Sequence, residues 1–168
     1  MGARTSLTLY PGMTGMMENT FIGVKNRSST ITADVEVPQG GANGVIVAQG
    51  GPLRLYLNDG KPTYTYNWIG LERYTVGGTE ALPAGKARIT LDFAYDGDGR
   101  GKGGSAVLSV NGKTVAEGRI PKTTPNTFSL DEGADVGEDD DTSVTEAYVA
   151  GIKSRFTGRI DKVTIEVK

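Results

Sequence analysis

The sequence contains no cysteine and no histidine. Without cysteine, the chain has no disulfide, thiol nucleophile, iron–sulfur cluster or thiolate zinc site. Without histidine, it has no Ser-His-Asp triad, no imidazole metal ligand and no side chain that ordinarily titrates near neutral pH. These absences exclude many classes of hydrolase and metalloenzyme. The cellular compartment stays undetermined, because a chain without thiols suits either redox environment.

The sequence also has little net charge and no long hydrophobic run. Eighteen basic and 20 acidic residues leave a formal net charge of −2, which gives no bulk attraction to nucleic acid or to an anionic membrane. No apolar stretch approaches the roughly 20 residues of a membrane span. The N-terminus lacks the basic segment followed by an apolar run that would predict a signal peptide. We therefore expect neither nucleic acid nor membrane as a partner.

Glycine is abundant, with 25 residues among 168, and it mostly separates short apolar runs. Several of these runs alternate apolar and polar residues, as β-strands do. The segments 30–37, 88–95 and 162–167 show the alternation most clearly. Asn111-Gly112 and Asp59-Gly60 predict tight hairpins, because both central residues of a type I′ turn need positive φ. The pattern predicts an all-β, antiparallel two-sheet sandwich of about twelve strands, forming a single domain over residues 1–168.

An aromatic row marks one predicted strand. Tyr64, Tyr66 and Trp68 alternate with polar residues and therefore share one face. Aromatic side chains usually bury their large surface, so we expect a core position or a contact with a partner domain. The alternative is a glycan platform, because the C–H groups of a pyranose pack against aromatic rings.

An acidic segment covers residues 123–152, with eight carboxylates and no lysine or arginine. A solvated loop is the common form of such a charge run. The alternative is a calcium site, because Ca²⁺ binds six to eight oxygens from carboxylates and backbone carbonyls in loops. The sequence suggests no other cofactor. The candidate calcium ligands are Asp131, Asp135, Asp139, Asp140 and Asp141.

Several short runs along nearly the whole chain form a familiar pattern: 9–13, 18–19, 25–28, 63–68, 71–74, 93–97, 101–104, 128–132, 135–137 and 156–163. In this order, they resemble the C-terminal region of large bacterial arylsulfatases. That resemblance implies a concanavalin A-like or laminin G-like jelly roll, attached to a sulfatase catalytic domain in a parent protein. The sulfatase nucleophile comes from Cys or Ser in C/S-x-P-x-R, whereas the matching run 50–54 has Gly50 at that position, so no catalytic residue carries over.

Three classes of function follow. The first, which we favour, is a non-catalytic accessory domain that serves domain packing or assembly, with the sulfatase catalytic domain or a second copy of the chain as partner. The alternative is a lectin-like carbohydrate-binding module, with or without calcium. A hydrolase with paired carboxylates is disfavoured, because no predicted strand carries a row of acids that could flank a glycosidic bond.

Overall fold

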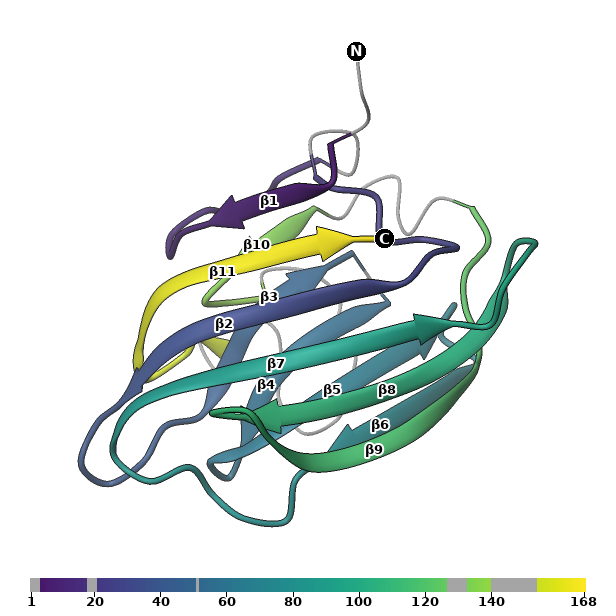
Figure 1. The fold of residues 1–168 in the computed structure, drawn as a ribbon. Coiled ribbons are helices and arrows are strands. Elements are labelled where there is room, and N and C mark those ends of the chain that lie inside the picture. Colours follow the sequence, from purple (N-terminus) through teal and green to yellow (C-terminus); the bar gives the residue numbers. More distant parts are fainter. Residues whose placement is uncertain (1–3, 18–20, 51, 127–132, 140–153) are drawn as a thin grey trace.

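The computed structural model describes residues 4–17, 21–50, 52–126, 133–139 and 154–168. Within these residues the chain forms two antiparallel sheets and no α-helix (Figure 1). The six-stranded sheet has the order β1 (Ser6–Leu9), β11 (Arg159–Val167), β2 (Ser29–Val37), β7 (Gly85–Tyr95), β8 (Lys102–Val110) and β9 (Lys113–Lys122). The five-stranded sheet has the order β10 (Ala134–Val136), β3 (Gly44–Gln49), β4 (Leu53–Asn58), β5 (Lys61–Trp68) and β6 (Glu72–Gly77).

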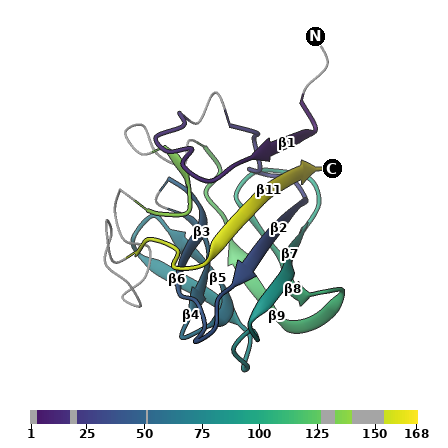
Figure 2. The ribbon, with the colours of Figure 1, turned by 90° about the vertical axis from the view of Figure 1, so that its left-hand side faces the viewer.

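The two sheets lie face to face as the layers of a sandwich (Figure 2). This confirms the predicted antiparallel jelly-roll sandwich, with eleven strands in the described residues where about twelve were expected. In the part of the chain that the structure describes, no helix has the length and apolar character needed to cross a bilayer.

The core lies between the layers and follows from the alternation along the long strands. In β2, Ile31 and Val35 are buried and lie on the inward face. The strand register places Ile31 opposite Leu91 of β7 and Ile165 of β11, which are also buried. Each sheet therefore presents an apolar inward face to the other sheet, and burial of that surface is the main force that holds the layers together.

The outward face of the six-stranded sheet is polar. A row of hydroxyl side chains crosses all six strands in register, one residue per strand. These residues are exposed or half-buried, and charged residues lie on both sides of the row. Consequently this face stays open to solvent and available to a ligand. The row consists of Thr8, Thr164, Thr32, Thr90, Ser109 and Thr114.

The outward face of the five-stranded sheet is instead closed over β3, β4 and β5. Tyr56, Thr63 and Thr65 point away from the core and are nevertheless buried. Their polar atoms are paired: the Tyr56 hydroxyl is hydrogen-bonded to Thr65 Oγ1 at 2.9 Å, and Thr65 Oγ1 to Thr75 Oγ1 at 3.1 Å. Such pairing is required because a buried polar group without a partner costs stability.

A buried ion pair lies on this closed face. Arg54 of β4 donates from Nε and Nη2 to the carboxylate of Asp139, at 2.6 and 2.9 Å, and both side chains are 1% exposed. Arg54 Nη1 also donates to the backbone carbonyls of Leu53, at 2.7 Å, and of Gly50. Ser154 Oγ accepts a hydrogen bond from the Asp139 amide at 2.9 Å. The pair therefore ties the residues that follow β10 to the middle of the sheet.

Removal of one charge from this pair should destabilise the fold strongly. We expect Asp139→Asn to lower the free energy of unfolding by about 3–5 kcal/mol, because the buried Arg54 guanidinium would lose the carboxylate that it binds through two nitrogens. Asp34→Asn is the matched control, since its exposed pair with Arg88 should be worth no more than about 1 kcal/mol. Urea unfolding measures both. Equal losses in the two variants would contradict the assignment of a stabilising role to the buried pair.

Tight turns connect neighbouring strands. Asn111-Gly112 and Asp59-Gly60 both have positive φ, as predicted. A third such turn joins β5 to β6, where Ile69 has φ +45° and Gly70 has φ +75°. Positive φ is unfavourable for a β-branched residue, which is why the sequence pattern did not reveal this turn.

Relief of this strain should stabilise the protein. We expect Ile69→Asn to raise the free energy of unfolding by about 1 kcal/mol, because asparagine tolerates the left-handed region that isoleucine disfavours. Leu71→Asn, at an even more exposed position of the same turn without positive φ, should give no gain. Denaturant titrations of both variants provide the comparison. A gain in Leu71→Asn as large as that in Ile69→Asn would attribute the effect to the loss of exposed apolar surface instead.

Candidate functional site

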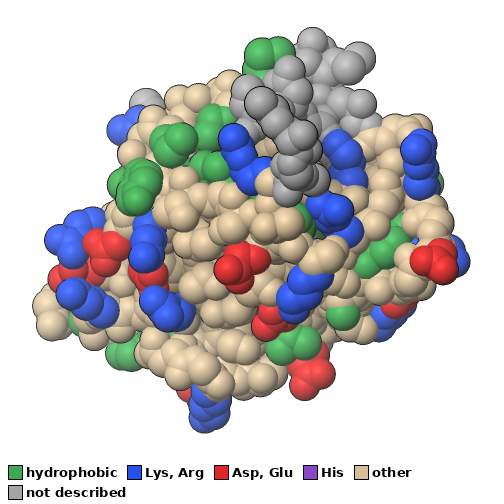
Figure 3. Space-filling model, turned by 45° about the horizontal axis from the view of Figure 1, so that its top comes forward, with side chains coloured by type: hydrophobic (Ala, Val, Ile, Leu, Met, Phe, Trp, Pro, Cys, Tyr) green, Lys and Arg blue, Asp and Glu red, His purple; other side chains and the backbone are tan. Residues whose placement is uncertain are grey.

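A polar groove of about 310 Å³ lies on the open outward face of the six-stranded sheet. Its volume is at the lower end of the range of about 300–1,000 Å³ typical of ligand sites. Acidic and basic side chains gather on this side of the molecule, at the left of Figure 3, over the ends of β2, β7 and β11. Six hydrogen-bonding side chains line the groove: Asp34, Lys86, Arg88, Asn111, Asp161 and Lys162.

Strand register brings these residues together from distant parts of the sequence. The alternation that buries Val35 turns Asp34 outward on β2. Antiparallel pairing places Arg88 of β7 beside Asp34 on one side and Lys162 of β11 on the other. The register of β11 shifts between Ile160 and Lys162, so Asp161 is an extra residue in a bulge at the rim. The groove therefore rests on three paired strands and on the turn that contains Asn111, which fix the relative positions of its backbone.

Hydrogen bonds further fix the centre of the groove. The Arg88 guanidinium donates to the Asp34 carboxylate from Nε at 2.8 Å and from Nη2 at 3.3 Å. The side-chain oxygen Oδ1 of Asn111 accepts a hydrogen bond from the backbone N–H of Arg88 at 2.9 Å. The backbone N–H of Asn111 donates to the backbone carbonyl of Arg88 at 2.8 Å. The hydrogen bond with Asp34 raises the pKa of Arg88. The hydrogen bonds with Asp34 hold the Arg88 side chain in place. Because that side chain is 61% exposed, it is still accessible to a ligand.

A second hollow, of about 290 Å³, lies beside the turn at Pro11 and Gly12. Its polar side chains are Glu138 and Arg155, whose carboxylate and guanidinium lie 3.2 Å apart. Glycine, proline and apolar residues form the rest of its wall. With two polar side chains instead of six, this hollow offers fewer hydrogen bonds to a polar ligand than the groove.

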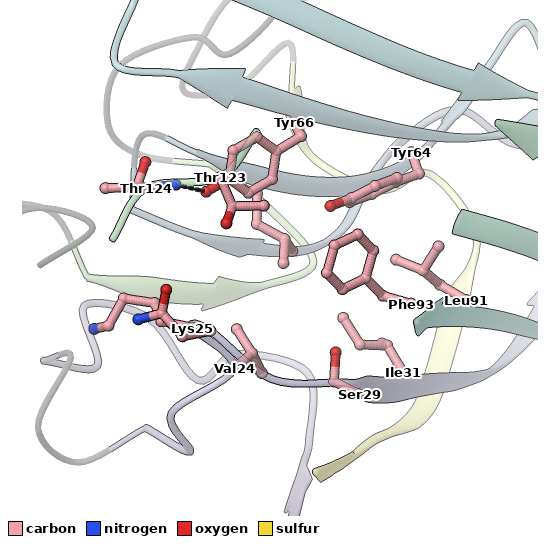
Figure 4. A pocket seen from close by; sticks show the side chains of 12 residues that line it. Val24, Lys25, Ser29, Ile31, Tyr64, Tyr66, Leu91, Phe93, Thr123 and Thr124 are labelled. Carbon is pink, nitrogen blue, oxygen red and sulfur yellow. Dashed lines mark hydrogen bonds between the residues drawn. The ribbon is translucent and has the colours of Figure 1, made fainter. Parts of the chain in front are cut away.

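An interior cavity lies between the sheets (Figure 4). Its walls carry Tyr64, Tyr66 and Phe93, and the Tyr66 hydroxyl accepts a hydrogen bond from the Thr124 amide at 2.7 Å. The enclosed volume is about 20 Å³, which is enough for a single water molecule. A sugar does not fit this cavity.

The aromatic row thus divides between core and surface. Tyr64 and Tyr66 are each 3% exposed, and desolvation raises the pKa of both hydroxyl groups. Both rings therefore lie in the core, as expected. The glycan platform stays a prediction, and it would require these two rings to become accessible to solvent. Trp68 is half-buried and lies under the Lys122 ammonium, with Nζ 3.9 Å from the ring centroid.

Two of the five candidate calcium ligands are described in the structure, whereas Asp131, Asp140 and Asp141 lie outside the described residues. Asp139 binds Arg54, and Asp135 is buried and accepts a hydrogen bond from the Gly15 amide at 2.7 Å. No group of three metal-ligating side chains occurs in the described part of the chain. Calcium binding stays a prediction, and Asp139 could serve as a ligand only by leaving Arg54.

A melting experiment tests the calcium hypothesis. A ligand cage absent from the unfolded chain would stabilise the fold by about 2.7 kcal/mol at a hundredfold excess of Ca²⁺ over Kd. We expect a higher melting temperature in calcium than in EDTA with NaCl at equal ionic strength. If calcium and NaCl give the same midpoint, the effect is charge screening and the segment is no metal site.

Comparisons with known proteins relate the chain to others by fold. No protein-family model and no curated protein sequence matches it. Among solved structures, it is similar to the CBM40 domain of the Ruminococcus gnavus IT-sialidase bound to α2,3-sialyllactose. The TM-score is 0.55 at 14% identity, over 97% of this chain and 89% of that one.

Two further similar structures support the same fold. A protein from Bacteroides ovatus ATCC 8483, described as a candidate carbohydrate-binding protein, gives a TM-score of 0.59 at 17% identity, over 96% of this chain and 43% of that one. Domains LG4-5 of the mouse laminin α1 chain give a TM-score of 0.52 at 14% identity, over 99% of this chain and 40% of that one. The chain thus has the sandwich fold of carbohydrate-binding and laminin G-like domains. These comparisons lend the arylsulfatase resemblance no support, and it stays a prediction.

Proposed function

We propose that this chain is a non-catalytic carbohydrate-binding module and that the polar groove is its binding site. The observation that carries the proposal is the set of six hydrogen-bonding side chains on one rigid, open sheet face. The fold shared with carbohydrate-binding modules supports it. This proposal replaces the accessory role favoured from the sequence as the leading function.

The chemistry of the groove suits sugar hydroxyls. Asp34 accepts hydrogen bonds, Arg88 donates them, and the Asn111 side chain can do both. The ion pair between Arg88 and Asp34 holds both side chains in position before a ligand arrives, which lowers the entropy cost of binding. Among the residues that the structure describes, no aromatic ring lines the groove. Binding would therefore depend on hydrogen bonds that compete with water, and we expect modest affinity.

Attachment to a sulfatase catalytic domain and formation of a homo-oligomer remain further proposals. The first is supported by the similar runs in the sequence. The second is supported by exposed apolar side chains at the turn between β5 and β6, where Ile69 is 58% and Leu71 is 71% exposed, because such side chains favour association. A monomer in light scattering at high micromolar concentration would contradict the homo-oligomer.

Glycan binding should depend on the groove and on no other part of this face. We expect the chain to bind saccharides on a glycan array, and Arg88→Ala to weaken that binding by about tenfold or more, because the substitution removes a charged donor and releases Asp34. Arg119→Ala is the matched control, since Arg119 forms a pair with Asp96 outside the groove and its side chain is about as exposed as that of Arg88. Equal binding by wild type and both variants would place the site elsewhere. Binding to no glycan would contradict the proposed function.

A further inference from the structure

The groove has an ordered arrangement of charge. Two rows cross the strands β11, β2 and β7, and each row reads basic, acidic, basic. The acidic residues all come from β2, whereas both flanking strands supply lysine or arginine. The first row is Lys162, Asp34 and Arg88, and the second is Arg159, Glu36 and Lys86.

The arginines and the acids of these rows neutralise one another. Arg88 binds Asp34 through two nitrogens, as described above. Arg159 lies 2.8 Å from Glu36 and 3.1 Å from Asp161. Every acid of the groove and its rim therefore has an arginine partner.

The two lysines are different. Among the described residues, no carboxylate lies within ion-pair distance of the ammonium of Lys86 or of Lys162. Both residues are exposed and both line the groove. Two lysines without an ion-pair partner thus lie on opposite sides of the site. Arg88 and Arg159 face three acids, Asp34, Glu36 and Asp161, so the two lysines bring the groove and its rim to a net charge of +1.

Spacing allows both lysines to contact one ligand. Lys86 and Lys162 stand on the two strands that flank β2 and are offset by two residues along it. With strands about 4.8 Å apart and a rise of about 3.3 Å per residue, their Cα atoms are about 12 Å apart. Two long, flexible side chains can converge from that distance on one anionic group above β2, with Arg88 and Asn111 beneath it to bind neighbouring hydroxyls.

From this arrangement we infer that the groove binds an acidic saccharide, whose carboxylate or sulfate group is held by Lys86 and Lys162. The inference rests on the proposed carbohydrate-binding function and specifies its ligand class. A neutral sugar would use the hydrogen-bonding groups at the centre of the groove and leave both ammonium charges unpaired. An acidic sugar would use the same groups and pair the ammonium charges as well.

Titration calorimetry of the full chain with matched ligands tests this inference. Lactose, 3′-sialyllactose and lactose 3′-sulfate share one scaffold and differ in charge. Trigalacturonate and its methyl ester form a second pair. We expect the acidic member to bind about tenfold more tightly at low salt, as two exposed ion pairs allow. We expect most of that preference to disappear in about 1 M NaCl, where the Debye length falls to about 3 Å. A preference confined to 3′-sialyllactose and trigalacturonate would identify the bound group as a carboxylate. A preference confined to lactose 3′-sulfate would identify it as a sulfate.

The double variant Lys86→Gln/Lys162→Gln should lose this preference and still bind the neutral ligands. Lys61→Gln/Lys168→Gln removes the same charge outside the groove and should retain it. All four positions are exposed, so folding should be unaffected, which circular dichroism verifies. Equal affinity for acidic and neutral ligands, or a preference that survives in Lys86→Gln/Lys162→Gln, would overturn the inference and leave the proposed function intact. If none of these saccharides binds, both the inference and the proposed function are overturned.

Discussion

Alternation of apolar and polar residues along the long strands is the constraint on which the rest of the structure depends. It gives each sheet one apolar face, and the two sheets can bury those faces only against each other. The outward faces then differ. The six-stranded sheet leaves its polar face open to solvent, whereas the five-stranded sheet is closed on both sides over β3 to β5. A surface for ligand binding is therefore available on the first sheet, and the second needs internal partners for its polar groups.

The contrast between two ion pairs follows from these environments. Arg54 and Asp139 are closed off from water, so water cannot replace the contact that either would lose with the other. Arg88 and Asp34 form a similar two-nitrogen contact on the open face, where water can replace either partner at little cost. The first pair stabilises the fold, and the second orders a surface that a ligand can reach. The same residue types thus have different roles because one sheet face is buried and the other is exposed.

Much of this fold can be predicted from the sequence, because strand alternation and turn residues are local signals. Segment 30–37 forms β2 with the predicted faces, and Asn111-Gly112 forms the predicted turn. The groove is different, since its residues come from three strands and the turn between β8 and β9 and meet through register, which local patterns do not specify. Alternation along segment 30–37 puts Asp34 on the polar face of that strand, but no local signal pairs it with Arg88. Likewise, the partner of Asp139 is Arg54, 85 residues away, so the run of acids by itself indicates a solvated loop or a calcium site and no ion pair.

The most direct test of the proposed groove is to map the contact surface of a bound saccharide by NMR. Amide ¹H–¹⁵N shifts would be followed while 3′-sialyllactose is added to the full chain. We expect the largest shifts at residues 34–36, 86–88, 111 and 161–162, with little change at residues 64–66 of the core. Largest shifts around the hollow that contains Glu138 and Arg155, or at the turn between β5 and β6, would contradict the proposed binding site.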